Sequence, residues 1–332
     1  MNKKRLIFAC FSLALAVLVY SVWLMPLPVI HSISLPQTKS IINAKMCFAH
    51  MELIMRPFPT LPQEAMVYKT YLPEMSGRTV QQIASGNFDM KESEIKSIKS
   101  NTQHMITGEK YNLLVDDDGV IYYYQPSERL NINKLGNRSR EGYPSDEQCE
   151  RIAWKFLEDH GLMPEGEVFL SKIIDNTSSY VMTVRLGRKL NGIEIIPPGE
   201  RIYIDIMKDG TIRSVFIDWS IIKPFKTYPL KSPDAAIKTL ETGDGIVRGA
   251  QMQPLVNMNR DGSIDFFNIA KGELISTDIV YFPSYGKVNY VQPFYRFTIK
   301  VKNGNLYAYT NAISDNYLIK SGDEKSPKET QD

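Results

Sequence analysis

The longest apolar run of the chain lies at its N-terminus. Leu6 to Met25 comprises twenty residues without a charge, and as a helix this is long enough to cross the roughly 30 Å hydrocarbon core of a bilayer. Lys3, Lys4 and Arg5 precede the run, and cations in this position favour the cytoplasmic side. The pattern predicts a single-pass anchor, with the N-terminus in the cytoplasm and the main body outside it.

A cleaved signal peptide is the alternative interpretation of this segment. The apolar region of a signal peptide usually has about 7–15 residues and ends in small residues before the cut. Here the run continues through Val22, Trp23 and Leu24, and no small-x-small site ends it. The sequence therefore favours an uncleaved anchor.

The clearest helix signal beyond the anchor begins at Ser145. Ser145 and Gln148 have the spacing of a capping box, and Gly161 supplies the left-handed residue that commonly ends a helix. Between them, one stripe recurs at helical spacing: Cys149, Ile152, Ala153, Phe156, Leu157 and His160. This stripe predicts a helix with one face packed on a partner layer.

Alternating strand patterns follow this helix and predict that partner layer. The apolar positions with period two are Tyr180, Met182, Val184 and Leu186, then Ile202, Ile204 and Ile206, then Val215, Ile217 and Trp219. Asn191-Gly192 and Asp209-Gly210 are turn signals between the strands. We expect one helix to cover one face of an antiparallel sheet.

The same order of elements is expected on either side of this unit. Upstream, Ser76 begins a helix that is preceded by a strand at 66–70 and followed by a hairpin at 111–115 and 120–124. Downstream, Ser232 caps a helix that is followed by strand-like runs at 274–285, 291–301 and 305–312. A short helix is also predicted at 40–48. Helix-then-hairpin units repeated in this way predict an α+β fold.

Charge and cysteine content exclude two classes of protein. The formal net charge of +2 includes the three cations before the anchor, so the body is nearly neutral and lacks the basic surface of a nucleic-acid-binding protein. Cys10, Cys47 and Cys149 are too few for a disulfide scaffold. Cys149 lies in the apolar helix stripe, which favours a buried free thiol over a Cys47–Cys149 bridge.

Catalytic chemistry is not indicated by any motif in the chain. His31, His50, His104 and His160 are the four histidines, and none lies beside a nucleophile elbow or in a zinc-binding spacing. We expect His160 to complement the negative end of the helix at 145–160. The sequence predicts no catalytic residues and no cofactor.

Two acidic turns resemble metal sites but lack full ligand sets. Asp116-Asp117-Asp118-Gly119 places carboxylates at consecutive positions, where they cannot converge on one ion. The run from Asn257 to Asn268 has the outline of an EF-hand loop, but asparagines replace the first and last acidic ligands. Both are predicted to be solvated turns without metal.

The tyrosine run Tyr122-Tyr123-Tyr124 leaves two interpretations open. Tyrosines on an exposed strand could stack on a sugar or a peptide, and half-buried aromatic residues in strands are a common structural feature. No ligand-binding residue is assigned from the sequence.

The strand and turn motifs resemble those of the membrane-anchored YycH/YycI-type regulators and their relatives with PepSY-like modules. The segments that carry the resemblance are 180–188 before Leu190-Asn191-Gly192-Ile193, 201–215 with Asp209-Gly210, 228–236, 291–297 and 307–312. In that family the extracytoplasmic part is non-catalytic and modulates a sensor histidine kinase by contact. The resemblance therefore implies regulation by protein–protein contact.

These observations together predict a domain plan. It comprises a cytoplasmic stub at 1–5, a transmembrane helix at 6–25, a juxtamembrane linker at 26–65, an N-terminal α+β module at 66–142, a PepSY-like module at 143–228, a second PepSY-like module at 229–319 and a disordered tail at 320–332. Two alternative functions stay open: an extracytoplasmic inhibitor or chaperone of a secreted peptidase, and an enzyme acting on cell-wall polymer.

Overall fold

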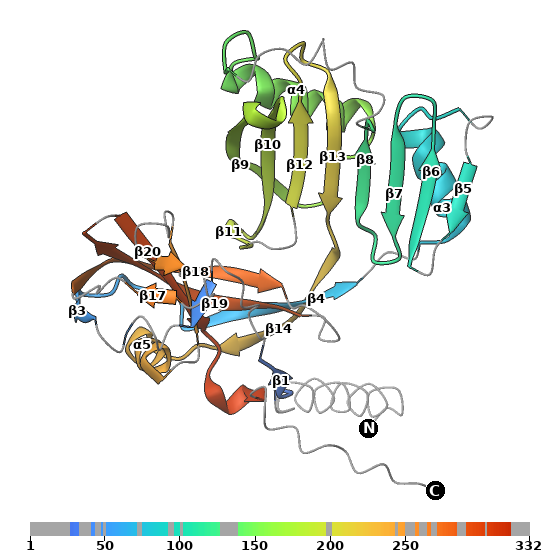
Figure 1. Ribbon diagram of the computed structural model, residues 1–332. Coiled ribbons are helices and arrows are strands. Elements are labelled where there is room, and N and C mark those ends of the chain that lie inside the picture. The colour runs from blue at the N-terminus through green and yellow to red at the C-terminus, as the bar shows by residue number, and fades with distance from the viewer. Residues whose placement is uncertain are drawn as a thin grey trace, which may run out of the picture.

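A computed structural model gives the arrangement of most of the chain beyond the predicted anchor. It describes residues 27–32, 41–43, 48, 51–71, 75–91, 96–99, 102–126, 139–196, 201–242, 245–249, 256–258, 264–266, 271–283, 290–302 and 304–319. The predicted stub, anchor and tail lie outside these ranges. Within them, no helix is long and apolar enough to cross a membrane. The described part is an α+β fold that is mostly β-sheet, with few helices (Figure 1).

Nine strands form the larger sheet. Its strands are β5 (Lys96–Lys99), β6 (Gln103–Thr107), β7 (Asn112–Asp116), β8 (Ile121–Tyr124), β9 (Glu167–Asn176), β10 (Val181–Leu190), β11 (Ile193–Glu194), β12 (Arg201–Ile206) and β13 (Ile212–Asp218). They lie in the order β11-β10-β12-β13-β8-β7-β6-β5, and β9 pairs with the other side of β10. The predicted hairpin of β7 and β8 is confirmed.

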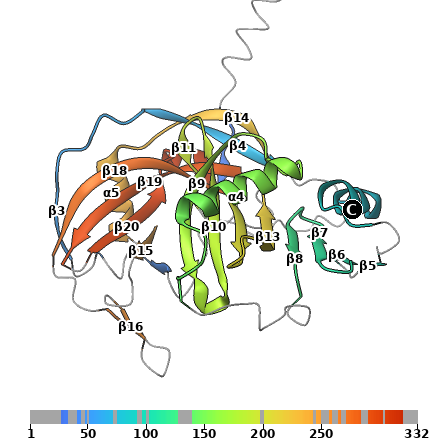
Figure 2. The ribbon, with the colours of Figure 1, turned by 90° about the horizontal axis from the view of Figure 1, so that it is seen from above.

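Helix α4 (Asp146–Asp159) covers the β9–β13 half of this sheet, as predicted from its apolar stripe (Figure 2). Ser145 and Gln148 form the expected capping box, and Gly161 has a φ of +59°. Cys149, Ala153 and Leu157 are buried against Val184, Ile204 and Val215 and their neighbours in one apolar core.

Helix α3 (Gly77–Gln82), extended by a π-helical turn (Ile83–Asn87), packs on the other half of the sheet. Val80 and Ala84 are buried in the same core as α4. The two helical segments meet at their C-terminal ends, where the Asn87 side-chain amide donates to the His160 carbonyl at 2.8 Å and the His160 Nδ1 contacts the Asn87 carbonyl. His160 therefore ties the two halves together at the end of α4.

Eight strands form the second sheet. They are β2 (Ile41–Asn43), β3 (Glu52–Ile54), β4 (Glu64–Tyr71), β14 (Ile221–Pro229), β15 (Ile246–Gly249), β18 (Lys271–Pro283), β19 (Tyr290–Val301) and β20 (Gly304–Asn311). The predicted helix after Ser232 is present as α5 (Pro233–Thr242), and it buries Ala236, Ile237 and Leu240. These side chains pack in a core with Phe297 and Ile299 of β19. Two short pairs complete the described strands: β16 (Val256–Met258) with β17 (Ile264–Phe266), and β1 (Ile30–His31) with β21 (Leu318–Ile319).

Sheet membership departs from the predicted modules 66–142 and 143–228 in two places. The strand predicted at 66–70 lies in β4, which pairs with β14 and β19 of the eight-stranded sheet rather than with the hairpin that follows it. Likewise, β14 follows β13 of the nine-stranded sheet in the sequence but belongs to the eight-stranded sheet. The segment 75–218 is therefore inserted between two strands that pair with each other, from Tyr71↔Ile221 to Glu64↔Pro229.

The segment 26–65, predicted to be a linker, also contributes to the fold. β1 pairs in parallel with β21 near the end of the described chain, β3 pairs with β18, and β2 pairs with β15. The prediction of a helix at 40–48 is wrong over residues 41–43, which are the strand β2. Pairing with strands about 200 residues away overrides the local preference, which is weak in such short segments.

Polar contacts join the two sheets near β11. The Arg296 guanidinium donates to both carboxylate oxygens of Asp278, at 2.9 and 2.6 Å, and to Glu194 of β11 at 3.2 Å. Asn191 in the turn before β11 donates to the Tyr68 hydroxyl at 3.0 Å. Ile195 and Tyr281 form a parallel bridge between the sheets. These contacts fix how the inserted segment sits on the eight-stranded sheet.

Buried tyrosines predict that the fold loses stability in alkali. Burial raises the pKa of Tyr228 to about 12, whereas tyrosine in an unfolded chain has a pKa of about 10. Burial also raises the pKa values of Tyr123 and Tyr281. Because the folded state favours the protonated phenol, this contribution to stability is complete below about pH 10 and is lost as the pH rises toward 12.

Urea denaturation between pH 8 and pH 11.5 measures this effect. We expect the midpoint to fall above pH 10, and the fall to be shallower in Tyr228→Phe, which has no phenol to ionise at that position. A midpoint that stays constant up to pH 11.5 would contradict the assignment of buried, protonated tyrosines.

Candidate functional site: the open face of the nine-stranded sheet

The two helices lie on one face of the nine-stranded sheet, and the opposite face carries a different set of side chains. Strand alternation divides them: Ile204 and Val215 point into the core beneath α4, whereas their neighbours Tyr203 and Phe216 point to the other side. We call this second side the open face. Side chains in the middle of this face, such as Tyr203, Phe216 and Tyr122, are half-buried or exposed, whereas Val181, Thr183 and Ser214 are buried.

Cross-strand register aligns seven side chains of the open face in one row. We call them the central row: Lys172, Arg185, Tyr203, Phe216, Tyr122, Leu114 and Met105, from β9 through β10, β12, β13, β8 and β7 to β6. The middle of the row is aromatic, with ring centroids 6.0 Å apart for Tyr203 and Phe216 and 6.4 Å for Phe216 and Tyr122. One end is basic and the other is aliphatic.

Two arginines lie against the same tyrosine ring at the basic end. The guanidinium carbons of Arg185 and Arg201 are 5.7 and 5.3 Å from the centre of the Tyr203 ring, within the range of a cation–π contact. Arg201 also lies 5.8 Å from the Phe216 ring. Asp218 is the cross-strand neighbour of Arg201, and burial raises the pKa of this carboxyl.

A polar pocket of about 420 Å³ opens beside the central row, toward the end of the sheet that is far from β11. Its lining residues come from β8 and the residue after it, the end of β9 and the turn that follows, β10, β12 and β13: Tyr122, Tyr124, Gln125, Asn176, Ser179, Val181, Asp205, Arg213 and Ser214. The Asp205 carboxylate accepts hydrogen bonds from the Thr183 and Ser214 hydroxyls, each at 2.6 Å. This carboxylate is held rigidly by its neighbours.

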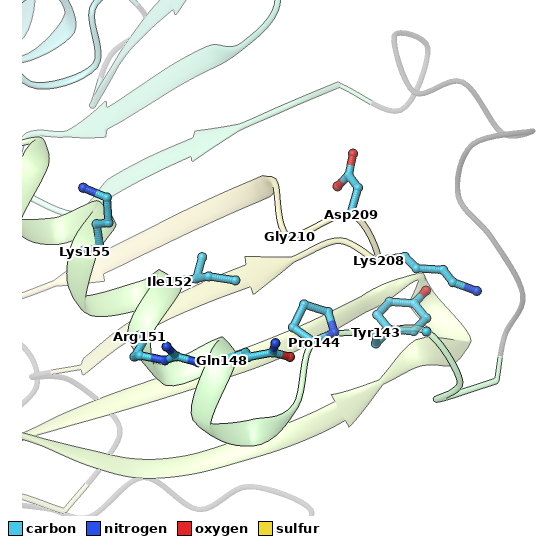
Figure 3. A pocket seen from close by; sticks show the side chains of 10 residues that line it. Tyr143, Pro144, Gln148, Arg151, Ile152, Lys155, Lys208, Asp209 and Gly210 are labelled. Carbon is cyan, nitrogen blue, oxygen red and sulfur yellow. The ribbon is translucent and has the colours of Figure 1, made fainter.

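A second cleft lies on the helix side of the same sheet (Figure 3). It has a volume of about 620 Å³ and lies between α4, the segment before it and the β12–β13 turn. Arg151, Lys155 and Lys208 make its rim basic. Lys155 pairs with Asp159 at 2.8 Å, and the Asp209 carboxylate accepts from the Thr211 hydroxyl and amide at 2.6 and 3.0 Å.

The histidines and the free cysteine have structural surroundings where the structure describes them. His104 is buried, with its Nε2 3.8 Å from an Asp117 carboxylate oxygen, and His160 caps α4. The His31 carbonyl accepts a hydrogen bond from Gln292. Cys149 is a buried free thiol, as predicted, and burial raises its pKa. His50 and Cys47 lie outside the described residues.

Of the two acidic turns, the first lies wholly within the described residues and the second only in part. Gly119 has a φ of +83° and its amide donates to the Asp116 carbonyl at 2.9 Å, which is a tight turn. In the second turn, β16 and β17 pair with Asn257 opposite Asp265, while Asn259, Asp261 and Asn268 lie outside the described residues. Within the described part of the chain, no three His, Cys, Asp or Glu side chains lie together as metal ligands would.

The tyrosine run is divided between the two faces of the sheet. Tyr123 is buried in the core and stacks on Phe88, whereas Tyr122 and Tyr124 stack on each other on the open face, with ring centroids 4.7 Å apart. The sequence indicated Tyr122 but missed Arg185, Arg201 and Asp205. These residues occupy the polar positions of strands that alternate between apolar and polar side chains. Only the register between neighbouring strands brings them together into one site.

Comparisons with known proteins give weak structural likenesses. No protein-family model matches the chain, and no curated relative matches it. Among solved structures, the Bacillus megaterium YpeB C-terminal domain is similar over 73% of this chain and 94% of its own, with 13% identity and a TM-score of 0.36. An uncharacterized protein from Eubacterium rectale is similar over 80% of this chain and 88% of its own, with 9% identity and a TM-score of 0.41.

Proposed function

We propose that the protein is a non-catalytic, membrane-anchored regulator that binds another protein of the cell envelope outside the cytoplasm. The first candidate partner is a sensor histidine kinase of a two-component system, which is the partner implied by the resemblance to YycH/YycI-type proteins with PepSY-like modules. The order of α4 followed by the antiparallel strands β9 to β13 agrees with that resemblance.

The central row is the observation that supports contact rather than chemistry. Tyrosine and arginine are, with tryptophan, the side chains enriched among the energetic anchors of protein–protein interfaces, and here they lie together on the open face. Tyr122 is 37% exposed although it lies in the middle strands of the sheet. A partner surface that covered this row would remove its apolar side chains from water, which favours association.

Site-specific photocross-linking in cells tests this proposal. The full chain carries p-benzoylphenylalanine in place of Tyr122, and a matched protein carries it in place of Arg151 on the exposed side of α4. We expect a protein adduct from position 122 and not from position 151. Adducts that contain a histidine kinase support the proposed partner, and adducts that contain a peptidase support an inhibitor or chaperone instead.

Two outcomes would overturn the proposal. One is a folded, correctly inserted protein that gives no adduct at position 122 but an abundant one at position 151. The other is a cytoplasmic signal from a reporter fused after Asp332, because the proposal requires the body of the protein to lie outside.

A further inference from the structure

We infer that the basic end of the central row binds a carboxylate side chain of the partner, placed beside an apolar stretch of the same polypeptide. This inference rests on the proposed function and specifies the chemistry of its contact. It is derived from the groups around Tyr203.

The first observation is that two positive charges share one aromatic ring. Arg185 and Arg201 both lie within 6 Å of the centre of Tyr203, one from the neighbouring strand and one from two positions earlier on the same strand. The Nε atoms of both are enclosed, and neither has a hydrogen-bond partner among the described residues. Like charges held close together repel each other, and a bound anion would relieve this repulsion.

The second observation concerns the acids nearby. Asp205, two positions beyond Tyr203, has both carboxylate oxygens engaged by hydroxyls. Asp218 lies opposite Arg201 on the neighbouring strand, where burial raises the pKa of its carboxyl and the charge of Arg201 lowers it. Lys172, which is exposed and lies opposite Arg185 in the row, adds a further positive charge. In this register three cations, Lys172, Arg185 and Arg201, therefore lie beside two carboxylates, those of Asp205 and Asp218.

The third observation is that the arginines lie at one end of a row of apolar side chains. A guanidinium presents a planar fork of N–H donors that matches a carboxylate. From Arg185 the row continues over Phe216 and Tyr122 to Leu114, four strand spacings away, which is about 19 Å at roughly 4.8 Å per strand. A matching ligand has a carboxylate at one end and apolar side chains over the next 19 Å or so.

Selection from a random peptide library tests this inference without knowledge of the natural partner. Twelve-residue peptides displayed on phage are selected on the full chain in detergent, and the winning peptides are synthesised for affinity measurements. We expect enrichment of Asp or Glu next to aromatic or aliphatic residues. Against one such peptide, Arg185→Gln/Arg201→Gln is expected to lose about tenfold or more in affinity, whereas Lys155→Gln on the helix side is expected to lose none.

Peptides without acidic residues, or with equal affinity for the arginine variant, would overturn the inference. The proposed function would then still be decided by cross-linking at position 122, which reports contact whatever the charge of the partner. If the double variant does not fold, the salt dependence of the wild-type protein's affinity for the selected peptide tests the charge pair instead. An affinity that is unchanged between about 0.05 and 0.5 M salt excludes a charge pair, because ions screen it over this range.

Discussion

Phe297→Ala is expected to lower the free energy of unfolding of the eight-stranded sheet by about 3–5 kcal/mol. Phe297 lies in β19 and is fully buried, and the centre of its ring is 6.5 Å from that of Phe58 and 5.9 Å from that of Tyr295. The neighbouring strands β18 and β20 pair with both edges of β19 here, so the surrounding structure cannot collapse into the space that the ring leaves.

Urea denaturation followed by circular dichroism measures the change. Lys300→Ala, on the same strand but exposed, serves as the matched control and is expected to change the free energy by less than about 0.5 kcal/mol. A loss of under about 1 kcal/mol for Phe297→Ala would show that the sheet and α5 do not pack as described.

Leu157→Ala is expected to cost about 2–5 kcal/mol in the nine-stranded sheet. Leu157 of α4 is fully buried in the core between the helix and the strands. Phe156 precedes it in the same apolar stripe but is only partly buried, with its ring 4.2 Å from the His160 ring. We therefore expect Phe156→Ala to cost less than Leu157→Ala, although phenylalanine is the larger side chain.

The control for this pair is Lys155→Ala, on the opposite side of α4. Its ammonium pairs with Asp159, and both side chains are more than half exposed, so its removal is expected to have little effect. Equal losses for Lys155→Ala and Leu157→Ala would mean that α4 does not lie with its stripe toward the sheet.

The helices and the local hairpins could be predicted from the sequence because their determinants lie within a few residues of each other. Ser145 and Gln148 cap α4, and Asn191-Gly192 supplies the two left-handed residues of the turn after β10. The strand at β10 begins after Tyr180, whose φ of +63° belongs to the preceding turn. Alternation alone does not reveal such a residue.

The placement of β4 and the composition of the site could not be predicted in the same way. Each depends on which strands are neighbours and in what register, and no local signal specifies this. The strand β4 has an ordinary strand pattern, yet its partners lie far along the chain. Arg185, Tyr203 and Phe216 are likewise unremarkable in sequence and become a site only when three strands align them.

The insertion of residues 75–218 between β4 and β14 has a consequence for the order of folding during synthesis. Tyr71 meets Ile221 in the ladder, so β4 leaves the ribosome about 150 residues before its partner. At about 5–20 residues per second this delay is roughly 8–30 s. The strands of the nine-stranded sheet emerge during that interval, the last of them, β13, only at its end, while the alternating strand at 64–71 still lacks its partners β14 and β19. A nascent chain in that state exposes unpaired strand edges, which favour aggregation until β14 and then β19 emerge and pair with β4.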